Sequence, residues 1–421
     1  MNLKKLLPAG LIAVSLALSF SGCSGSGSSG IAENIEPAVT EDTAAVTLAT
    51  STTVVTTTTE PPVPPDISVN LLAVGDNLVQ TYVYLAAQAQ AGGTGYNFGP
   101  LYENVKPVVQ AADVAIINQE TLICGGDYEI SGSGFNFNSP VELGDAMVDL
   151  GFDIFTIANN HMLDKGIGGL ASSLDYWDGM MQKHPILTIG AYRNAEDQDT
   201  LRVQYVRGMR IAYLSYAEQL NGYSLPADTD IKIGMTSDEA LMERQIKRAK
   251  EVADAVVVAV HWGAEDTHWV RDDVKELARK LVGWGADVIL GTHSHTAETM
   301  EYIPREDGTQ GFVFYSMGNF ISAQTDNFNM VGEMNSFNLV KHGDTGKVTV
   351  EDVKCKPVIT HYDAGFANLR LYPYDLYTTE LADAHALPYT HAYPETAKDF
   401  GKGVIDAIIE NNIPAEFRDL D

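Results

Sequence analysis

Residues 287–295 read DVILGTHSH, so that a short apolar run leads through a glycine into two histidines one residue apart. Four more apolar runs end in polar residues in the same way, at residues 67–74, 113–118, 153–158 and 256–260. Patterns typical of helices lie between the runs, at residues 141–150, 168–182, 238–252 and 272–285. Buried strands that alternate with helices predict an α/β fold whose strands are largely parallel.

Each of the five runs is followed, within a few residues of its end, by side chains that can bind a metal ion. In open α/β sheets, ligands bind beyond the carboxyl ends of the strands, where residues distant in sequence can meet. A role as a cap or turn former explains one such residue, but it explains five strands poorly. The candidate ligands are Asp76, Glu120, Asn160, His261, His293 and His295.

These ligand types indicate a particular class of metal. A set of carboxylate, amide and imidazole ligands is typical of a divalent transition metal, because imidazole favours Mn, Fe or Zn over Ca or Mg. Two such ions about 3.5–4 Å apart form a site that hydrolyses phosphate esters or related acyl bonds. We therefore expect one or two ions of Mn, Fe or Zn per chain.

Six motifs contain the candidate ligands and their neighbours. In chain order they are Gly75-Asp76, Asn118-x-Glu120, Asn159-Asn160-His161-x-x-Asp164-x-Gly166, His261-Trp262-Gly263-x-Glu265, Gly291-x-His293-x-His295 and Tyr315-Ser316-Met317-Gly318-Asn319-Phe320. This series resembles the CapA family, the poly-γ-glutamate capsule biosynthesis proteins, a branch of the calcineurin-like metallophosphoesterases. The resemblance covers about residues 69–320. It implies an α/β fold, a metallophosphoesterase-like sandwich of two mixed β-sheets flanked by helices.

The resemblance also implies how the ligands divide between two ions. Glu120 would bridge the ions, and Asp76 and His295 would complete the first site. The second ion would bind Asn160, His261 and His293. Where phosphoesterases of this fold usually carry a further histidine for the first ion, this chain has Leu78, which puts two-metal catalysis in doubt.

Two further residues have catalytic roles by the same resemblance. His161 would bind no metal and would hydrogen-bond the substrate or protonate the leaving group. Asp164 would orient His161, as carboxylates commonly orient histidine. The role of the Gly318-Asn319 pair in the last motif does not follow from the sequence.

The N-terminal segment predicts export and anchoring. Lys4 and Lys5 precede an apolar run at residues 11–20 and then Ser21-Gly22-Cys23, which together predict a signal peptide over residues 1–22. The cysteine resembles that of a lipobox, so Cys23 would be lipidated and would hold an extracytoplasmic lipoprotein at the cell membrane. An ordinary secreted protein is the alternative. Residues 23–66 are rich in Gly, Ser, Thr and Pro and predict a disordered linker.

The rest of the chain divides into a folded domain at residues 67–360 and a C-terminal extension at residues 361–421, which we expect to pack on that domain. Three later runs, at residues 210–215, 311–316 and 347–354, predict antiparallel additions to the sheet. Cys124 and Cys355 predict either a disulfide or two buried thiols.

The charge of the chain limits its partners. Its 27 Lys and Arg residues against 56 Asp and Glu residues give a formal net charge of −29, which argues against nucleic-acid binding. The resemblance implies other partners, namely an anionic polymer such as poly-γ-glutamate and membrane ligase or export subunits. The function that we expect is synthesis, export or processing of that polymer, with metal-dependent hydrolysis if the protein is catalytic. The alternatives are a non-catalytic accessory or scaffold subunit and a generic extracellular phosphoesterase.

Overall fold

The computed structural model describes residues 63–126, 128–389 and 395–421. The signal peptide predicted at residues 1–22, the lipidation site Cys23 and most of the predicted linker lie outside the described residues. None of the helices in the described part has the length and apolar character that crossing a membrane requires.

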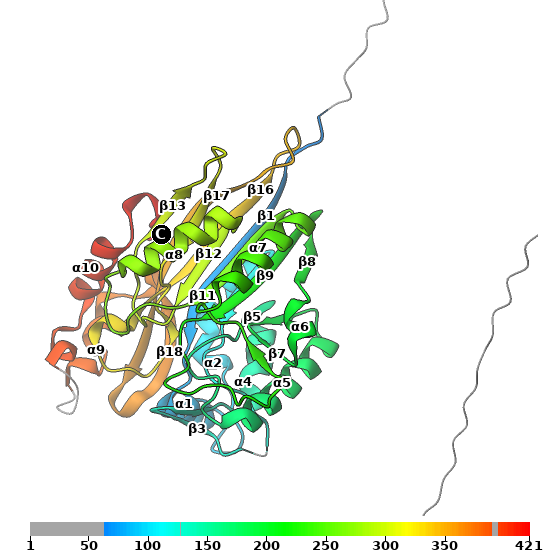
Figure 1. Cartoon of the computed structure of the whole chain (residues 1–421). Helices are drawn as coiled ribbons and strands as arrows, with labels where there is room; N and C mark the ends of the chain where they lie inside the picture. Colours follow the sequence, from blue (N-terminus) through cyan, green and yellow to red (C-terminus); the bar gives the residue numbers. More distant parts are fainter. Residues whose placement is uncertain (1–62, 127, 390–394) are drawn as a thin grey trace, which may run out of the picture. The chain divides into compact units, whose positions relative to one another are not determined.

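The larger of two main sheets has eight strands and contains both parallel and antiparallel pairs (Figure 1). Its central strands β1, β2, β5 and β6 are parallel, and β16, β17 and β18 extend it with antiparallel pairs. In spatial order the strands are β18 (Ala367–Pro373), β17 (Val348–Asp363), β16 (Val331–Lys341), β1 (Ile67–Asn77), β2 (Val114–Asn118), β5 (Ile154–Thr156) and β6 (Leu187–Ile189), with β15 (Asn319–Ile321) paired to the end of β1.

The second main sheet has six strands, and it corrects part of the sequence analysis. In spatial order they are β13 (Met300–Pro304), β14 (Gln310–Phe314), β12 (Val288–Thr292), β11 (Ala255–His261), β9 (Met209–Ala217) and β8 (Arg202–Val206). Of the three runs predicted as antiparallel additions, the run at residues 347–354 forms the start of β17, which is antiparallel to both of its neighbours as predicted. The other two runs are β9 and β14, and each pairs in parallel with a central strand, β11 or β12. Each is antiparallel only to its hairpin partner, β8 or β13, because it is the second arm of a hairpin whose other edge stays free for a parallel neighbour.

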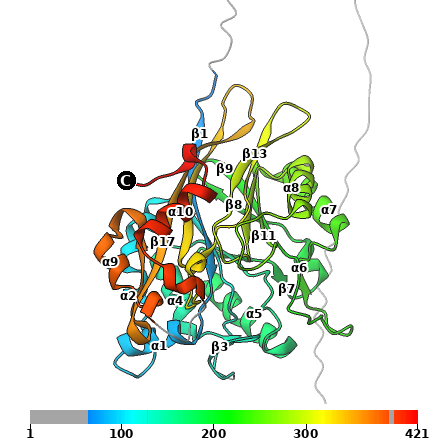
Figure 2. The same cartoon turned by 90° about the vertical axis from the view of Figure 1, so that its left-hand side faces the viewer.

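Helices cover both sheets on the outside. Figure 2 shows α7 (Glu239–Val252) and α8 (Asp272–Trp284) on the face of the six-stranded sheet that is turned away from the larger sheet. A further set of helices packs its apolar residues into the core around the eight-stranded sheet. They are α1 (Thr81–Gln90), α2 (Gly99–Tyr102), α3 (Lys106–Ala111), α4 (Val141–Leu150) and α5 (Gly166–Lys183). The structure thus confirms the predicted α/β class with two mixed sheets flanked by helices.

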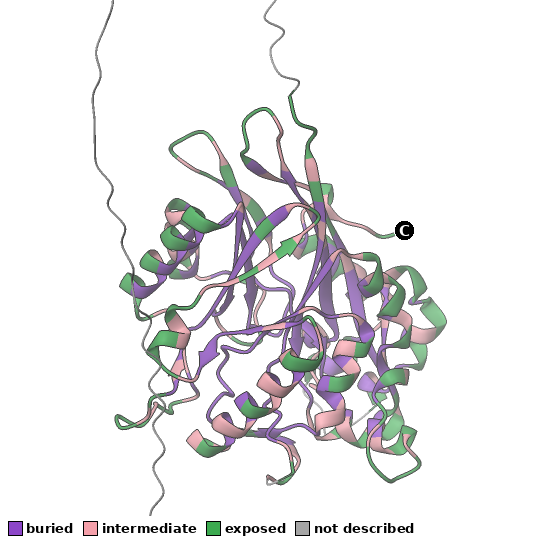
Figure 3. Cartoon of the chain, turned by 90° about the vertical axis from the view of Figure 1, so that its right-hand side faces the viewer, coloured by how far each residue is buried: buried purple, intermediate pink, exposed green. Residues whose placement is uncertain are grey.

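The core explains why the strand sequences are apolar without alternation. In β11, Val257 and Ala259 belong to the core between the sheets, whereas Val256, Val258 and Val260 pack under α7 and α8. Because successive side chains of a strand point to opposite faces, a strand covered on both sides must be apolar throughout. Figure 3 shows the strands of both sheets as largely buried and the outer sides of the helices as exposed.

The remaining strands and α-helices lie outside these layers. Two small two-stranded sheets pair β3 (Ser131–Ser133) with β4 (Asn136–Asn138) and β7 (Ala191–Tyr192) with β10 (Lys232–Ile233). The other helices are α6 (Ala195–Asp199), α9 (Thr379–Ala384) and α10 (Lys402–Asn412).

The C-terminal part is continuous with the larger sheet. Strand β17 runs across the predicted boundary at residue 360, and β18 pairs with it. Helix α10 places Ile405 and Ile409 in the main core. Cys124 and Cys355 are both buried free thiols, so the disulfide alternative is not realised in the structure.

Glu333 on β16 is a fully buried carboxyl group outside the strand ends. Its Oε2 atom accepts a hydrogen bond from Asn335 at 2.8 Å, and Oε1 has no hydrogen-bond partner among the described residues. Burial raises the pKa of Glu333 from 4.5 to about 8. The native state therefore retains a proton that the unfolded chain releases, and the stabilisation is present below pH 4.5 and is lost as the pH rises through 8.

We expect the Glu333→Gln substitution to remove this pH dependence. The free energy of unfolding should be measured in urea at pH 5.5, 7 and 8.5 for both proteins. From pH 5.5 to pH 8.5 we expect that of the unmodified protein to fall by roughly 2–4 kcal/mol more than that of the variant, at about 1.4 kcal/mol per pKa unit. The matched control is Glu351→Gln on β17, whose side chain is 44 % exposed. If both variants follow the pH profile of the unmodified protein, Glu333 does not hold the proton.

Candidate metal centre

The structure brings all six predicted ligands to one place, where strand ends from both sheets meet. β1, β2 and β5 end there from the larger sheet, and β11 and β12 end there from the smaller one. Each of the six residues is at most 4 % exposed. Convergence of parallel strand ends from two sheets therefore positions residues that span more than half of the chain.

Two buried carboxylates with different surroundings form the middle of the group. Asp76 is fully bonded, because Oδ1 accepts from Asn118 Nδ2 at 2.7 Å and Oδ2 accepts from the backbone N–H of His293 at 3.2 Å. Glu120 has no hydrogen-bond partner at either oxygen among the described residues. Burial, followed by the charge of Asp76, raises the pKa of Glu120 well above its usual value. A buried carboxylate without partners is costly unless a cation completes it.

Two histidines direct Nε2 toward Glu120 and use Nδ1 for a bond within the protein. His261 Nε2 lies 3.6 Å from Glu120 Oε1, and its Nδ1 is 2.9 Å from the hydroxyl of Thr292. His295 Nε2 lies 3.8 Å from the same oxygen, and its Nδ1 is 3.1 Å from Asn319 Oδ1. Metal-binding histidines typically have one nitrogen held in this way while the other stays free for the ion.

His293 has the opposite orientation. Its Nδ1 atom is buried and has no hydrogen-bond partner among the described residues, whereas Nε2 faces Gln219 and Glu265. The ring of His293 packs against that of His261, with 4.6 Å between the centroids. Nδ1 is therefore the nitrogen that His293 can offer to an ion.

Protonation differs among the three histidines. Burial lowers the pKa of His261 well below its usual value and lowers that of His293 to about 3, so both rings are neutral at pH 7. Burial acts on His295 in the same direction, but the carboxylates of Glu120 and Asp76 outweigh it and raise the pKa of His295 to about 10. Since only an unprotonated nitrogen binds a metal, an ion at this place would displace a proton.

The donor atoms fit a divalent ion. Two groups of three side chains have ligand atoms within 4.8 Å of one another, namely Glu120 with His261 and His293, and Asp76 with Glu120 and His295. Glu120 belongs to both groups, as the predicted bridging position requires. Asn160 adds an amide oxygen that lies 3.0 Å from His261 Nε2. Mixed imidazole and oxygen donors suit a transition metal.

His161 and Asp164 lie beside this group. His161 Nδ1 is 2.8 Å from Asp164 Oδ2, and Nε2 is 3.9 Å from Glu120 Oε1. The edge of the ring packs on Phe137, whose backbone N–H donates to Asp164 Oδ2 at 2.9 Å. The His161 ring is thus held by the protein on one side and directed at the metal ligands on the other.

Sequence reasoning missed several residues that support the group. Asn118, Thr292 and Asn319 bond three of the candidate ligands. Asn319 lies in the last motif, and its role becomes visible because β15 pairs with β1 so that Asn319 is the partner of Asp76. Gln219 and Asn221 follow β9, whose carboxyl end was not recognised as part of this edge.

Two motif glycines are required where the segment between β14 and β15 passes close to β1 and β12. A Cβ atom on Gly75 would lie 1.8 Å from the carbonyl oxygen of Gly318, and one on Gly291 would lie 1.8 Å from that of Tyr315. The neighbours are backbone atoms, so they cannot move away as a side chain would.

The Gly75→Ala substitution is therefore expected to destabilise the fold by at least about 2 kcal/mol in urea unfolding. The control is Gly179→Ala within α5, where nothing lies within 4 Å of the added Cβ. That variant should gain roughly 0.5–1 kcal/mol, because alanine favours a helix over glycine. Equal stability of the two variants would contradict the close approach.

Comparison with known proteins places the chain in a family. Residues 70–324 match the family described as bacterial capsule synthesis protein PGA_cap. The PGA biosynthesis protein CapA of Bacillus subtilis (strain 168) is 27 % identical over 282 residues, which cover 66 % of this chain and 70 % of the relative. The capsule biosynthesis protein CapA of Bacillus anthracis is 28 % identical over 240 residues, which are 55 % of either chain.

Solved structures with a related arrangement include an NAD nucleotidase of Haemophilus influenzae, with 12 % identity, a TM-score of 0.44 and coverage of 82 % of this chain and 60 % of that one. A 5'-nucleotidase of Candida albicans SC5314 has 9 % identity, a TM-score of 0.39 and coverage of 81 % and 57 %. The family match spans more than half of the chain, and the chain therefore belongs to the bacterial capsule synthesis protein family PGA_cap.

Proposed function

We propose that this chain is a metal-dependent hydrolase that acts in the synthesis, export or processing of an anionic capsular polymer such as poly-γ-glutamate. The observation that carries the proposal is Glu120, a buried carboxylate that has no hydrogen-bond partner among the described residues and faces the Nε2 atoms of His261 and His295. The names of the two Bacillus relatives support the link to capsule biosynthesis.

In this proposal the six predicted residues hold one or two ions of Mn, Fe or Zn. A bound divalent ion would polarise an acyl or phosphoryl oxygen and lower the pKa of a water molecule. Glu120, which belongs to both groups of ligands, would be shared between two ions. The ligands are Asp76, Glu120, Asn160, His261, His293 and His295.

His161 would manage the proton of the leaving group. Asp164 accepts from Nδ1, which fixes the ring and leaves Nε2 turned toward the centre. A histidine held in this way can protonate a departing amine or alcohol at Nε2. At 5 % exposed, the His161 residue is also largely shielded from bulk water.

The charges around the centre support an acyl bond over a phosphate monoester. The loops after the strand ends, residues 119–126, 157–166, 218–230, 262–271 and 293–299, contain one lysine, Lys165, and one arginine, Arg271. Lys165 donates to Asn136, and Arg271 is paired with Glu218 and Asp273. A phosphate dianion is usually bound by free arginine or lysine side chains, which a neutral amide carbonyl does not need.

One residue favours a second candidate function. Leu78 is buried where phosphoesterases of this fold usually carry a metal-binding histidine, so the first ion would have one imidazole ligand fewer and would keep only that of His295. A weak first site favours an accessory subunit that uses the metal to bind carboxylates of the polymer. In either function, we propose that a lipid at Cys23 anchors the protein on the outer side of the membrane, close to ligase and export subunits.

Elemental analysis of the purified protein tests the proposal, beside the Glu120→Ala and His293→Ala variants. We expect near-stoichiometric Mn, Fe or Zn that falls in both variants. Release of amino groups from poly-γ-glutamate by the loaded protein would support hydrolysis, and turnover of an aryl phosphate alone would favour a phosphoesterase. A folded protein that takes up none of these ions would refute the metal-dependent function.

A further inference from the structure

The loop that carries His293 fixes the position of its ring. His293 has a φ of 100°, and its backbone N–H is bonded to Asp76, so the ring has little freedom to choose another direction. The buried Nδ1 atom faces the candidate metal ligands, and Nε2 points to the loops after β9 and β11. The hydrogen-bond partner of Nε2 therefore determines whether Nδ1 is unprotonated and oriented to bind a metal ion.

Two side chains from those loops reach Nε2. Gln219 places its amide nitrogen 3.4 Å from Nε2, and its Oε1 atom is occupied by the backbone N–H of Asn221 at 3.0 Å. Rotating the amide by 180° would bring two donors together at Asn221, so the amide nitrogen is the group that faces His293. Glu265 offers a carboxylate whose Oε1 atom is 3.9 Å from Nε2.

These partners suit different states of the ring. A neutral imidazole that gives the Nδ1 lone pair to an ion carries its proton on Nε2, and Nε2 then needs an acceptor. The amide nitrogen of Gln219 can only donate, so it cannot serve. The carboxylate of Glu265 can accept, and its side chain is 48 % exposed and free to move the short distance required.

We propose that Glu265 is a positioning residue that accepts a hydrogen bond from His293 Nε2 when a metal ion is bound. The inference rests on the proposed metal binding and adds a residue of the fourth motif that no ligand or proton-transfer role explains. Carboxylates that hold a metal-binding histidine from behind commonly strengthen metal binding by 10–100-fold.

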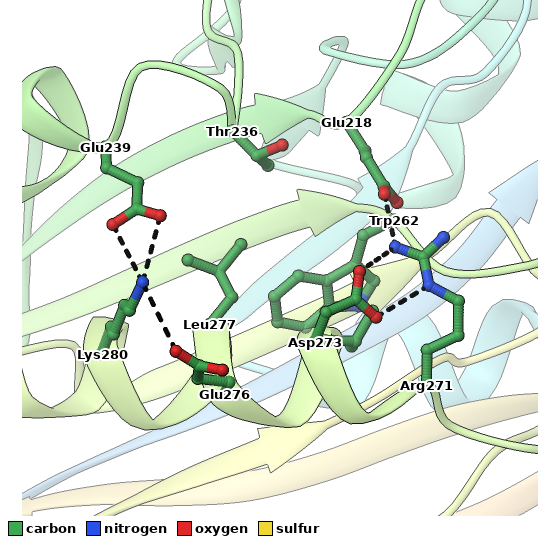
Figure 4. Close-up of a pocket in the computed structure, with 10 residues that line it drawn as sticks. Glu218, Thr236, Glu239, Trp262, Arg271, Asp273, Glu276, Leu277 and Lys280 are labelled. Atoms are coloured by element: carbon green, nitrogen blue, oxygen red, sulfur yellow. Dashed lines mark hydrogen bonds and ion pairs between the residues drawn. The ribbon is translucent and has the colours of Figure 1, made fainter.

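An ion-pair network holds the two loops together. Figure 4 shows Arg271 between the carboxylates of Glu218 and Asp273. Arg271 also donates to the carbonyl oxygen of Gly263 at 2.9 Å, and Glu218 accepts from the N–H of Gly263 at 2.9 Å. The residues next to Gln219 and those before Glu265 are therefore joined, which keeps both side chains on the outer side of His293.

The test is the affinity for Zn²⁺ alone, measured with the full chain by competition with a chelator. We expect Glu265→Ala to weaken binding by about 10–100-fold, and Glu265→Gln, which keeps an acceptor oxygen, to lie between Glu265→Ala and the unmodified protein. The melting temperature of the metal-free protein should not change, because Glu265 makes no hydrogen bond there among the described residues. The matched control is Glu243→Ala on α7, a carboxylate of similar exposure paired with Lys247, which should leave the affinity unchanged.

The outcomes separate this inference from the proposed function. If Glu265→Ala binds Zn²⁺ within about twofold of the unmodified protein while His293→Ala loses binding, the metal centre stands and the role of Glu265 is refuted. If the unmodified protein binds no Zn²⁺, both the centre and the role of Glu265 are refuted. A lower melting temperature of metal-free Glu265→Ala would also overturn the role, because a destabilised fold would then explain the weaker Zn²⁺ binding.

Discussion

The Glu120→Gln substitution is expected to remove metal binding and, at the same time, to stabilise the metal-free protein. Both oxygens of Glu120 are buried and have no hydrogen-bond partner in the described part of the chain, and burial raises the pKa of Glu120 well above its usual value. An amide of the same size has no charge to bury and can donate to a neighbouring ring nitrogen. The expected gain in the free energy of unfolding is about 1–3 kcal/mol, the usual penalty of an unsatisfied buried group.

The same change should weaken metal binding by more than about 100-fold, because Glu120 belongs to both groups of ligands and its loss affects each. The opposite signs of the two effects make the experiment specific. Substitution of a residue that only supports the fold would lower the stability of both the metal-free and the metal-bound protein. The measurements are thermal unfolding with and without Zn²⁺ or Mn²⁺ and the metal content after dialysis.

Glu333→Gln is the matched control, since Glu333 is also a fully buried carboxyl group, and one of its oxygens has no hydrogen-bond partner among the residues that the structure describes. It lies on β16 outside both groups of ligands. This variant should stabilise the metal-free protein at high pH and keep its metal. A Glu120→Gln variant that retains the metal content of the unmodified protein would show that the bridging role is wrong.

The strand ends were predictable from sequence because two signals coincide there. Buried strands are apolar on both faces, and a polar residue such as Asp76 or His261 directly after such a run stands out. Parallel pairing brings together the ends of β1, β2 and β5 in one sheet and those of β11 and β12 in the other. The packing of the two sheets, which the sequence pattern does not specify, then brings the two sets of strand ends to one place.

The loop after β9 could not be assigned in the same way. Arg207 and Gly208 form a hairpin turn with positive φ, which is a strong local signal for antiparallel pairing with β8. The parallel pairing of β9 with β11 joins residues far apart in the sequence, so the turn gives no indication of it. Gln219 and Asn221 therefore appear beside His293 and Asn160 only in the folded protein.

The choice of nitrogen in each histidine is likewise a property of the fold. His261 presents Nε2 because Thr292 holds its Nδ1, and Thr292 lies on the neighbouring strand β12. His293 presents Nδ1 because its loop has a left-handed backbone and Asp76 holds it. The spacing of histidines in a motif can indicate that they bind a metal, but the orientation of each ring depends on partners elsewhere in the chain.

If the protein is a hydrolase, His161→Ala is expected to lower its turnover by about 10²–10⁴-fold while the metal content stays the same. His161 belongs to neither group of ligands, although its Nε2 atom lies 3.9 Å from Glu120 Oε1. The substitution removes the proton donor and leaves the ligands in place. Turnover should be measured as amino groups released from poly-γ-glutamate, with elemental analysis of the same samples.

Asp164→Asn provides a graded comparison with His161→Ala. The amide keeps an oxygen for the N–H of Phe137 and for His161 Nδ1, but it loses the charge that favours a protonated ring. We expect turnover to fall by roughly 10-fold, with the metal unchanged. Loss of metal in His161→Ala would instead make His161 a ligand. A loaded unmodified protein that is as inactive as both variants, on the polymer and on an aryl phosphate, would favour the accessory role suggested by Leu78.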